Sequence, residues 1–127
     1  MQIRFARPTN NIPQLVTFYR KVLGWDVLAK FEDHDGFDGV ILGIAGAAWH
    51  VEFTAERGKT ALVAPSPDDL IALYLDDQEF AASRDRVLAA GVPLLASQNP
   101  YWDKRGAITI ADPDGYRVVL VLGRWRS

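Results

Sequence analysis

The feature that most constrains the fold of this chain is an internal repeat. When the 127-residue sequence is shifted by 67 residues without a gap, Gly24–Ala29 aligns with Gly91–Ala96, and Trp49–Phe53 aligns with Tyr116–Leu120. Self-similarity at a fixed offset is typical of a supersecondary unit that is present twice. The identities are few, so the repeat gains its weight from the order of the predicted elements in each half.

The hydrophobic pattern predicts the same order, βαβββ, in both halves. Asn10 or Asn11 can cap the first helix, which has Pro13 in its first turn and Gly24 after its last one. Asp76 and Glu79 resemble a capping box that opens the second helix. The strands are expected over residues 3–6, 26–31, 39–44 and 48–53 in the first half, and over 70–75, 93–96, 107–111 and 116–122 in the second.

Composition excludes several classes of protein. The chain has no cysteine, which removes disulfide frameworks, thiolate metal sites and cysteine nucleophiles. Its formal net charge of −2 argues against a nucleic-acid partner. No apolar run is long enough to span a membrane, and the first residues lack a signal core, so we expect a cytoplasmic protein.

Three motifs, in this order, resemble those of one superfamily: Phe18–Gly24, Ile71–Asp77 and Asp112–Leu120. The chain resembles the vicinal oxygen chelate superfamily, which includes glyoxalase I, bleomycin-resistance proteins and extradiol dioxygenases. The resemblance implies an α+β fold in which modules of about 1–60 and 66–127 form a cupped eight-stranded mixed sheet. The helices lie on its convex side, residues 1–127 make one domain, and the protein is a homodimer.

Metal-bearing members of this superfamily take ligands from the first and last strand of each module. The equivalent positions here are Arg4 (or Ile3, if the repeat offset is used), Glu52, Leu70 and Val119. Only Glu52 has a side chain that binds metals, and adding His50 still falls short of the usual three protein ligands. We therefore expect no cofactor, with a divalent metal as the alternative left open.

Alternation along the strands predicts which side chains face the cup. Arg4, His50, Glu52 and Arg117 are expected on its surface, and Tyr74 is expected to project into it. Tyr101 and Trp102 lie in a polar-aromatic loop, where they either stack on a ligand or anchor the loop itself. The residues expected to be buried under the helices are Ile3, Phe5, Val51, Phe53, Leu73, Val118 and Leu120.

The roles of the two titratable side chains stay open at this point. Glu52 is either the ion-pair partner of Arg4 or a catalytic base, and His50 is either a hydrogen-bonded wall residue or part of an acid–base pair.

The first functional hypothesis is a metal-free protein that binds a small anionic or aromatic molecule in its cup. The alternative is a small lyase, isomerase or glyoxalase-like enzyme that uses Glu52 as base or metal ligand. A third is a structural or regulatory dimer with a vestigial cup.

Overall fold

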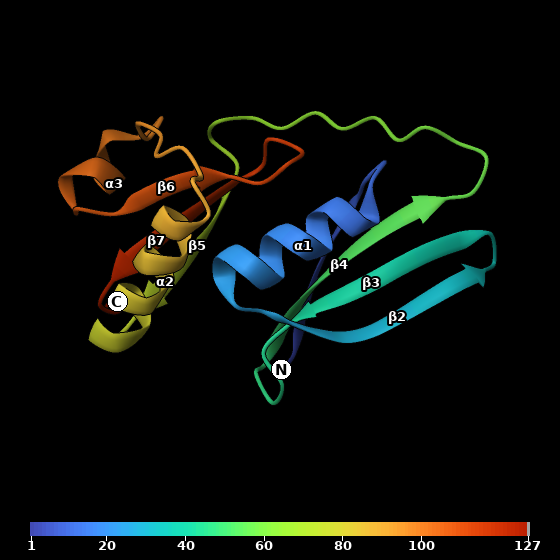
Figure 1. The fold of residues 1–127 in the computed structure, drawn as a ribbon, viewed down its shortest axis with the longest axis horizontal. Helices are drawn as coiled ribbons and strands as arrows, with labels where there is room; N and C mark the ends of the chain where they lie inside the picture. Colours follow the sequence, from blue (N-terminus) through green and yellow to red (C-terminus); the bar gives the residue numbers. More distant parts are fainter. Residues whose placement is uncertain (127) are drawn as a thin grey trace. The chain divides into compact units, whose positions relative to one another are not determined.

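The protein, described here by a computed structural model of residues 1–126, forms two compact units. The first unit covers residues 1–64, and the second begins at residue 65. The first contains β1 (Ile3–Pro8), α1 (Ile12–Leu23), β2 (Asp26–His34), β3 (Phe37–Gly43) and β4 (Trp49–Glu56). The second contains β5 (Leu70–Leu75), α2 (Asp77–Ala89), α3 (Pro100–Lys104), β6 (Ile108–Ala111) and β7 (Arg117–Leu122) (Figure 1).

The repeat predicted from the sequence is present in the topology. The first unit has a sheet of strand order β1-β4-β3-β2, and the second has a sheet of order β5-β7-β6. In each unit the first strand pairs in parallel with the last, and the neighbouring pair is antiparallel. Strand β5 begins 67 residues after β1 and has the same length, so the predicted α+β class is confirmed.

The prediction of one eight-stranded sheet is corrected by the structure, which has a four-stranded and a three-stranded sheet. The strand expected over 93–96 is reduced to one bridge, in which the Leu95 N–H donates to the Thr109 carbonyl at 2.9 Å. Pro93 has no N–H to offer a partner strand, which shortens the ladder. The loop expected around residues 99–105 contains the short helix α3, which Asn99 caps by accepting from the Tyr101 N–H.

Both long helices begin and end as the sequence indicates. Asn11 caps α1 by accepting from the Gln14 N–H at 3.1 Å. Gly24 ends that helix in the left-handed conformation, with φ of 71°. Asp76 and Glu79 form the capping box of α2, with bonds of 2.8 and 3.2 Å. Asn10, the other cap candidate, instead binds both backbone groups of Ala61 through its side-chain amide.

Tyr19 lies at the centre of the core of the first unit and is 0% exposed. Its ring lies 5.1 Å from Phe18, 5.0 Å from Trp25 and 5.2 Å from Phe53, measured between centroids. These contacts fix one face of the sheet against α1, since Phe53 belongs to β4. Register then places Val51, Val40 and Leu42 on the same face, and all three are buried.

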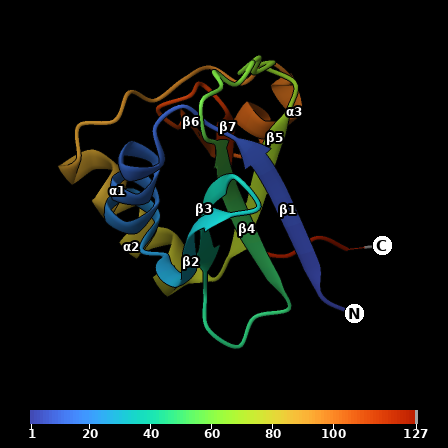
Figure 2. The ribbon, with the colours of Figure 1, turned by 90° about the vertical axis from the view of Figure 1, so that its right-hand side faces the viewer.

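Strand β1 departs from the expected burial. Val51, Phe53, Val118 and Leu120 are buried as predicted, but Leu73 is only half-buried, and Ile3 and Phe5 are 59% and 45% exposed. The predicted phase is right, because Ile3 pairs with Trp49 and Phe5 with Val51. Ile3 and Phe5 are nevertheless exposed, because β1 is at the edge of the sheet (Figure 2) and α1 packs mainly on β2, β3 and β4.

A bulge in β2 changes which of its side chains face α1. Val27 pairs with Leu42 but Ala29 pairs with Ile41, so Leu28 is an extra residue in the strand. Beyond the bulge, Phe31 pairs with Gly39, and its ring fills the space that a Cβ at position 39 would occupy. Gly39 is therefore needed for this close cross-strand contact.

Candidate functional site

Three polar side chains meet on the face of the first sheet opposite α1. Register pairs Arg4 with His50 on adjacent parallel strands, and alternation places Glu52 on that face. The Nε of Arg4 donates to Nε2 of His50 at 2.9 Å, and its Nη1 lies 3.4 Å from Oε2 of Glu52. We call Arg4, His50 and Glu52 the Arg4 cluster.

The hydrogen bonds of the Arg4 cluster show which atoms are still available. Nε2 of His50 accepts from Arg4 through its lone pair, so this hydrogen bond assigns the ring proton to Nδ1. The side chain of Glu52 is 14% exposed, whereas that of Arg4 is 50% exposed. Within residues 1–126, Nη2 of Arg4 makes no hydrogen bond, which leaves one edge of the guanidinium open to solvent.

An apolar surface borders the Arg4 cluster on the neighbouring strands. Ile41 pairs with Glu52 in the β3–β4 ladder and lies on the same face. The ring of Phe31 lies over Gly39 at the next position on that face. Ile41 and Phe31, both half-buried, were missed from the sequence because the bulge at Leu28 hides the phase of β2. A cross-strand aromatic opposite a glycine was the available signal.

The four positions equivalent to metal ligands carry different chemistry in the structure. Glu52 is close to a guanidinium, and Leu70 and Val119 have no donor atom. Val119, one of the four equivalent positions, is 0% exposed, as is Val121, so solvent does not reach this part of the second sheet. Among the described residues there is no group of three or more His, Asp or Glu side chains able to hold a metal ion.

The remaining predicted site residues lie in the second unit. Arg117 and Tyr74 are on the same face of the sheet. Arg117 pairs with Leu70 and Tyr74 pairs with Val121, and residues four apart in a strand point to the same side. Nη1 of Arg117 donates to the Ala96 carbonyl at 3.0 Å, so this guanidinium supports the segment before α3. The Arg4 cluster lies in the first unit, and a shared surface with Arg117 and Tyr74 stays a prediction.

Arg105 contacts the predicted aromatic residues, and the sequence analysis did not identify it as a site residue. Its Nη1 donates to the Tyr101 hydroxyl at 3.1 Å and its Nη2 to the Leu122 carbonyl at 3.3 Å. Its guanidinium carbon lies 6.0 Å from the centre of the Tyr74 ring. The ring of Trp102 packs edge-on against Tyr101 at 5.0 Å. These contacts favour the anchoring role for Tyr101 and Trp102; the four-residue spacing of Tyr101 and Arg105 was the available signal.

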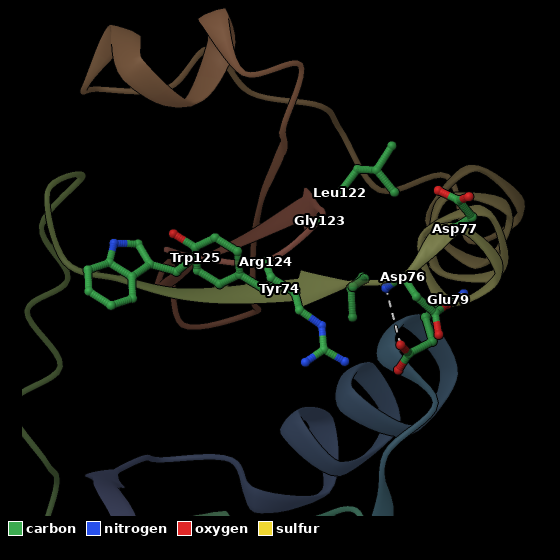
Figure 3. A pocket seen from close by; sticks show the side chains of 9 residues that line it. Tyr74, Asp76, Asp77, Glu79, Leu122, Gly123, Arg124 and Trp125 are labelled. Atoms are coloured by element: carbon green, nitrogen blue, oxygen red, sulfur yellow. Dashed lines mark hydrogen bonds between the residues drawn. The ribbon is translucent and has the colours of Figure 1, made fainter. Parts of the chain in front are cut away.

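A cavity of about 640 Å³ lies beside Tyr74 in the second unit. Figure 3 shows Tyr74, Arg124 and Trp125 on one side of it and the acidic first turn of α2 on the other. Asp76 and Glu79 are occupied by the capping box, in which Glu79 accepts from the Asp76 N–H. The carboxylates of Asp76 and Glu79 therefore serve helix initiation.

Comparison with known proteins agrees with this fold. Residues 3–54 match the YycE-like N-terminal domain and residues 68–121 the YycE-like C-terminal domain. The uncharacterized protein YycE of Bacillus subtilis is 38% identical over 121 residues, which cover 94% of this chain and 86% of YycE. The crystal structure of YycE, a protein of unknown function provisionally grouped with glyoxalase/fosfomycin resistance proteins, matches with a TM-score of 0.88 at 37% identity, over 99% of this chain and 92% of that one.

More distant structures share the fold. The fosfomycin resistance protein FosX of Listeria monocytogenes, solved as a glutamate-to-glutamine mutant with Mn(II) and 1S,2S-dihydroxypropylphosphonic acid, has a TM-score of 0.70 at 15% identity, over 95% and 90% of the two chains. TnmS3, an antibiotic-binding protein from Streptomyces, has a TM-score of 0.70 at 21% identity, over 98% and 96%.

The two βαβ-type units and these neighbours define a protein of the vicinal oxygen chelate superfamily. Within it, the chain belongs to the YycE-like family. No helix within residues 1–126 has both the length and the apolar character needed to cross a membrane.

Proposed function

We propose that this protein binds a small molecule with an anionic group and an apolar or aromatic body, and that it does so without a metal ion. The observation that carries the proposal is the position of Arg4, whose guanidinium lies within 3.4 Å of Glu52 and 2.9 Å of His50. The only two metal-binding side chains of the cluster are thus both bound to a permanent cation.

The chemistry of these donors argues against a divalent ion. A metal at Glu52 would have to displace a guanidinium or lie beside it, and like charges at that separation repel. Only two candidate ligands are close together, whereas catalytic sites usually provide three. The residues present therefore do not fit the metal that the FosX structure contains, and no step of the proposed function depends on one.

The cluster and its border suit an anion with an apolar body. The open edge of the Arg4 guanidinium offers two N–H groups to a carboxylate, phosphonate or phosphate, an arrangement that gives charge-assisted bonds. Ile41 and Phe31 provide an apolar surface one and two strands away from Arg4's partner strand β4. The antibiotic-binding activity named for TnmS3 is a precedent for binding on this fold without a stated metal.

A second candidate function is a lyase or isomerase that uses Glu52 as its base. One observation favours it: Oε2 of Glu52 contacts Arg4, while Oε1 makes no hydrogen bond in the described part of the chain. A free carboxylate oxygen beside a cation that holds an anionic substrate could remove a proton from that substrate. The variant below tests whether Glu52 balances the charge of Arg4.

Replacing Glu52 with glutamine is expected to strengthen binding of anionic probes several-fold, since the variant removes the negative charge beside Arg4. Stability should fall by about 1 kcal/mol or less, because Arg4 is half-exposed and solvent screens the pair. Benzoate titration by calorimetry and urea unfolding measure the two quantities.

Glu56→Gln is the matched control, because Glu56 lies on the same strand but pairs with Lys59 at 2.9 Å. That control should leave benzoate affinity unchanged. Weaker benzoate binding in Glu52→Gln would contradict the charge-balancing role.

We also propose that the protein is a homodimer, as the superfamily resemblance implies. The exposed Ile3 and Phe5 on the edge strand β1 support this, because an edge with apolar side chains is usually covered. Light scattering at micromolar concentration should give the mass of two chains, and Phe5→Lys should shift the mass towards one chain. A monomeric unmodified protein would refute the dimer. A cytoplasmic location remains a prediction.

A further inference from the structure

A groove of about 620 Å³ lies in the first unit, between α1 and the strands β2 and β3. Its residues Val27 and Val40 are on the α1 side of the sheet, opposite the face that carries the side chains of the Arg4 cluster. Figure 1 shows α1 beside the sheet of the first unit. The volume is within the range typical of small-molecule sites. Its lining includes four aliphatic residues, Ile12, Val16, Val27 and Val40, and two cations, Arg20 and Lys30.

The groove follows from the local sequence. The buried stripe of α1 runs through Leu15 and Tyr19, so Ile12 and Val16 stand on its flank and remain half-buried. The bulge at Leu28 separates Val27 and Lys30 by three residues while both pair with α1-facing partners, Leu42 and Val40. As a result, a half-buried valine and a long cationic side chain border the same apolar floor.

Charges of both signs line the groove. Arg20 and Lys30 make no ion pair or side-chain hydrogen bond with any residue from 1 to 126, and both are exposed. Glu32 and Asp38 also line the groove. Asp38 already accepts from Nε of Arg57 at 3.0 Å and from the Asp33 N–H at 2.9 Å. The Asp33 N–H, and then Arg57, hold the pKa of Asp38 below its ordinary value.

We infer that this groove is a second binding site, and that it takes a linear amphiphile with one anionic headgroup, such as a medium-chain carboxylate. The apolar chain covers Ile12, Val16 and Val40, and the headgroup lies between Arg20 and Lys30. Glu32 and Asp38, which line the same groove, select against a second negative charge on the ligand. The inference does not rest on the proposed function of the Arg4 cluster, although Phe31, which borders that cluster, also lines the groove.

Octanoate and octanol make a matched pair of probes, because they share the chain and differ in headgroup charge. In amide NMR titrations of the whole protein, both should shift the signals of Val16, Val27 and Val40. Octanoate should bind about two- to fivefold more tightly than octanol, the ratio that an exposed charge interaction supplies. Octanedioate, with a carboxylate at each end, should bind no better than octanol.

Three variants test which residues contribute to the binding of these probes. Combining Arg20→Gln with Lys30→Gln should remove the preference for octanoate and leave octanol affinity unchanged. Val16→Phe fills the groove and should weaken both probes. Arg4→Gln should leave the shifts at Val16, Val27 and Val40 intact, so a failure of the Arg4 proposal does not imitate a failure here. Equal affinity for octanoate and octanol, shifts confined to Arg4 and His50, or no shifts at all would each overturn the assignment.

Discussion

Replacing Arg4 with glutamine is expected to weaken benzoate binding by roughly 10- to 100-fold. A hydrogen bond to a charged group contributes about 1.5–3 kcal/mol, and the unpaired Nη2 of Arg4 can donate such a bond to a carboxylate. Glutamine has a similar reach and keeps the side chain polar, but it has no charge and no fork. Calorimetric titration of benzoate at low ionic strength measures the loss.

Two further variants show whether the loss belongs to the guanidinium fork. Arg4→Lys keeps the charge and loses the planar donor pair, so it should recover only part of the affinity. Arg57→Gln is the matched control, since Arg57 pairs with Asp33 and Asp38 at the far end of β4. Unchanged benzoate binding in Arg4→Gln would move the anion site away from this cluster.

Replacing Tyr19 with alanine should destabilise the protein by about 3–5 kcal/mol, the usual loss when a large aromatic side chain is removed from a core. Tyr19 is 0% exposed and contacts three other aromatic rings, so its removal leaves a cavity between α1 and the sheet. That loss is a large fraction of the total stability of a typical domain, about 5–15 kcal/mol. Urea unfolding followed by circular dichroism measures it.

Tyr101→Ala is the matched control for the core variant. Tyr101 is 45% exposed and its main contacts are with Arg105 and Trp102. Its removal should cost about 1 kcal/mol or less, as is usual for exposed positions. A comparable loss in the two variants would mean that Tyr19 is not the centre of a packed core.

Local signals in the sequence were enough to predict the two long helices and the repeat. Asn11, Gly24 and the pair Asp76 and Glu79 act through backbone groups within four residues of themselves, so their effect can be read without knowing the fold. The strand expected over 70–75 is β5, and it begins 67 residues after β1, since both halves carry the same local pattern.

Features that depend on neighbours in space could not be read in this way. The burial of Ile3 and Phe5 depends on where α1 lies, and α1 does not cover the edge strand. The phase of Phe31 depends on one extra residue at Leu28, which no composition signal marks. Alternation did bring Arg4, His50 and Glu52 to one face, because β1 and β4 are regular and paired without a shift.

The central claim is that a guanidinium, and not a metal ion, binds the anionic part of the ligand. The most direct measurement is a calorimetric titration of benzoate into protein dialysed against a chelator, repeated with Mn(II) added. We predict the same benzoate affinity in both titrations and its loss in Arg4→Gln. Binding that appears only after Mn(II) is added, and survives in Arg4→Gln, would contradict this account.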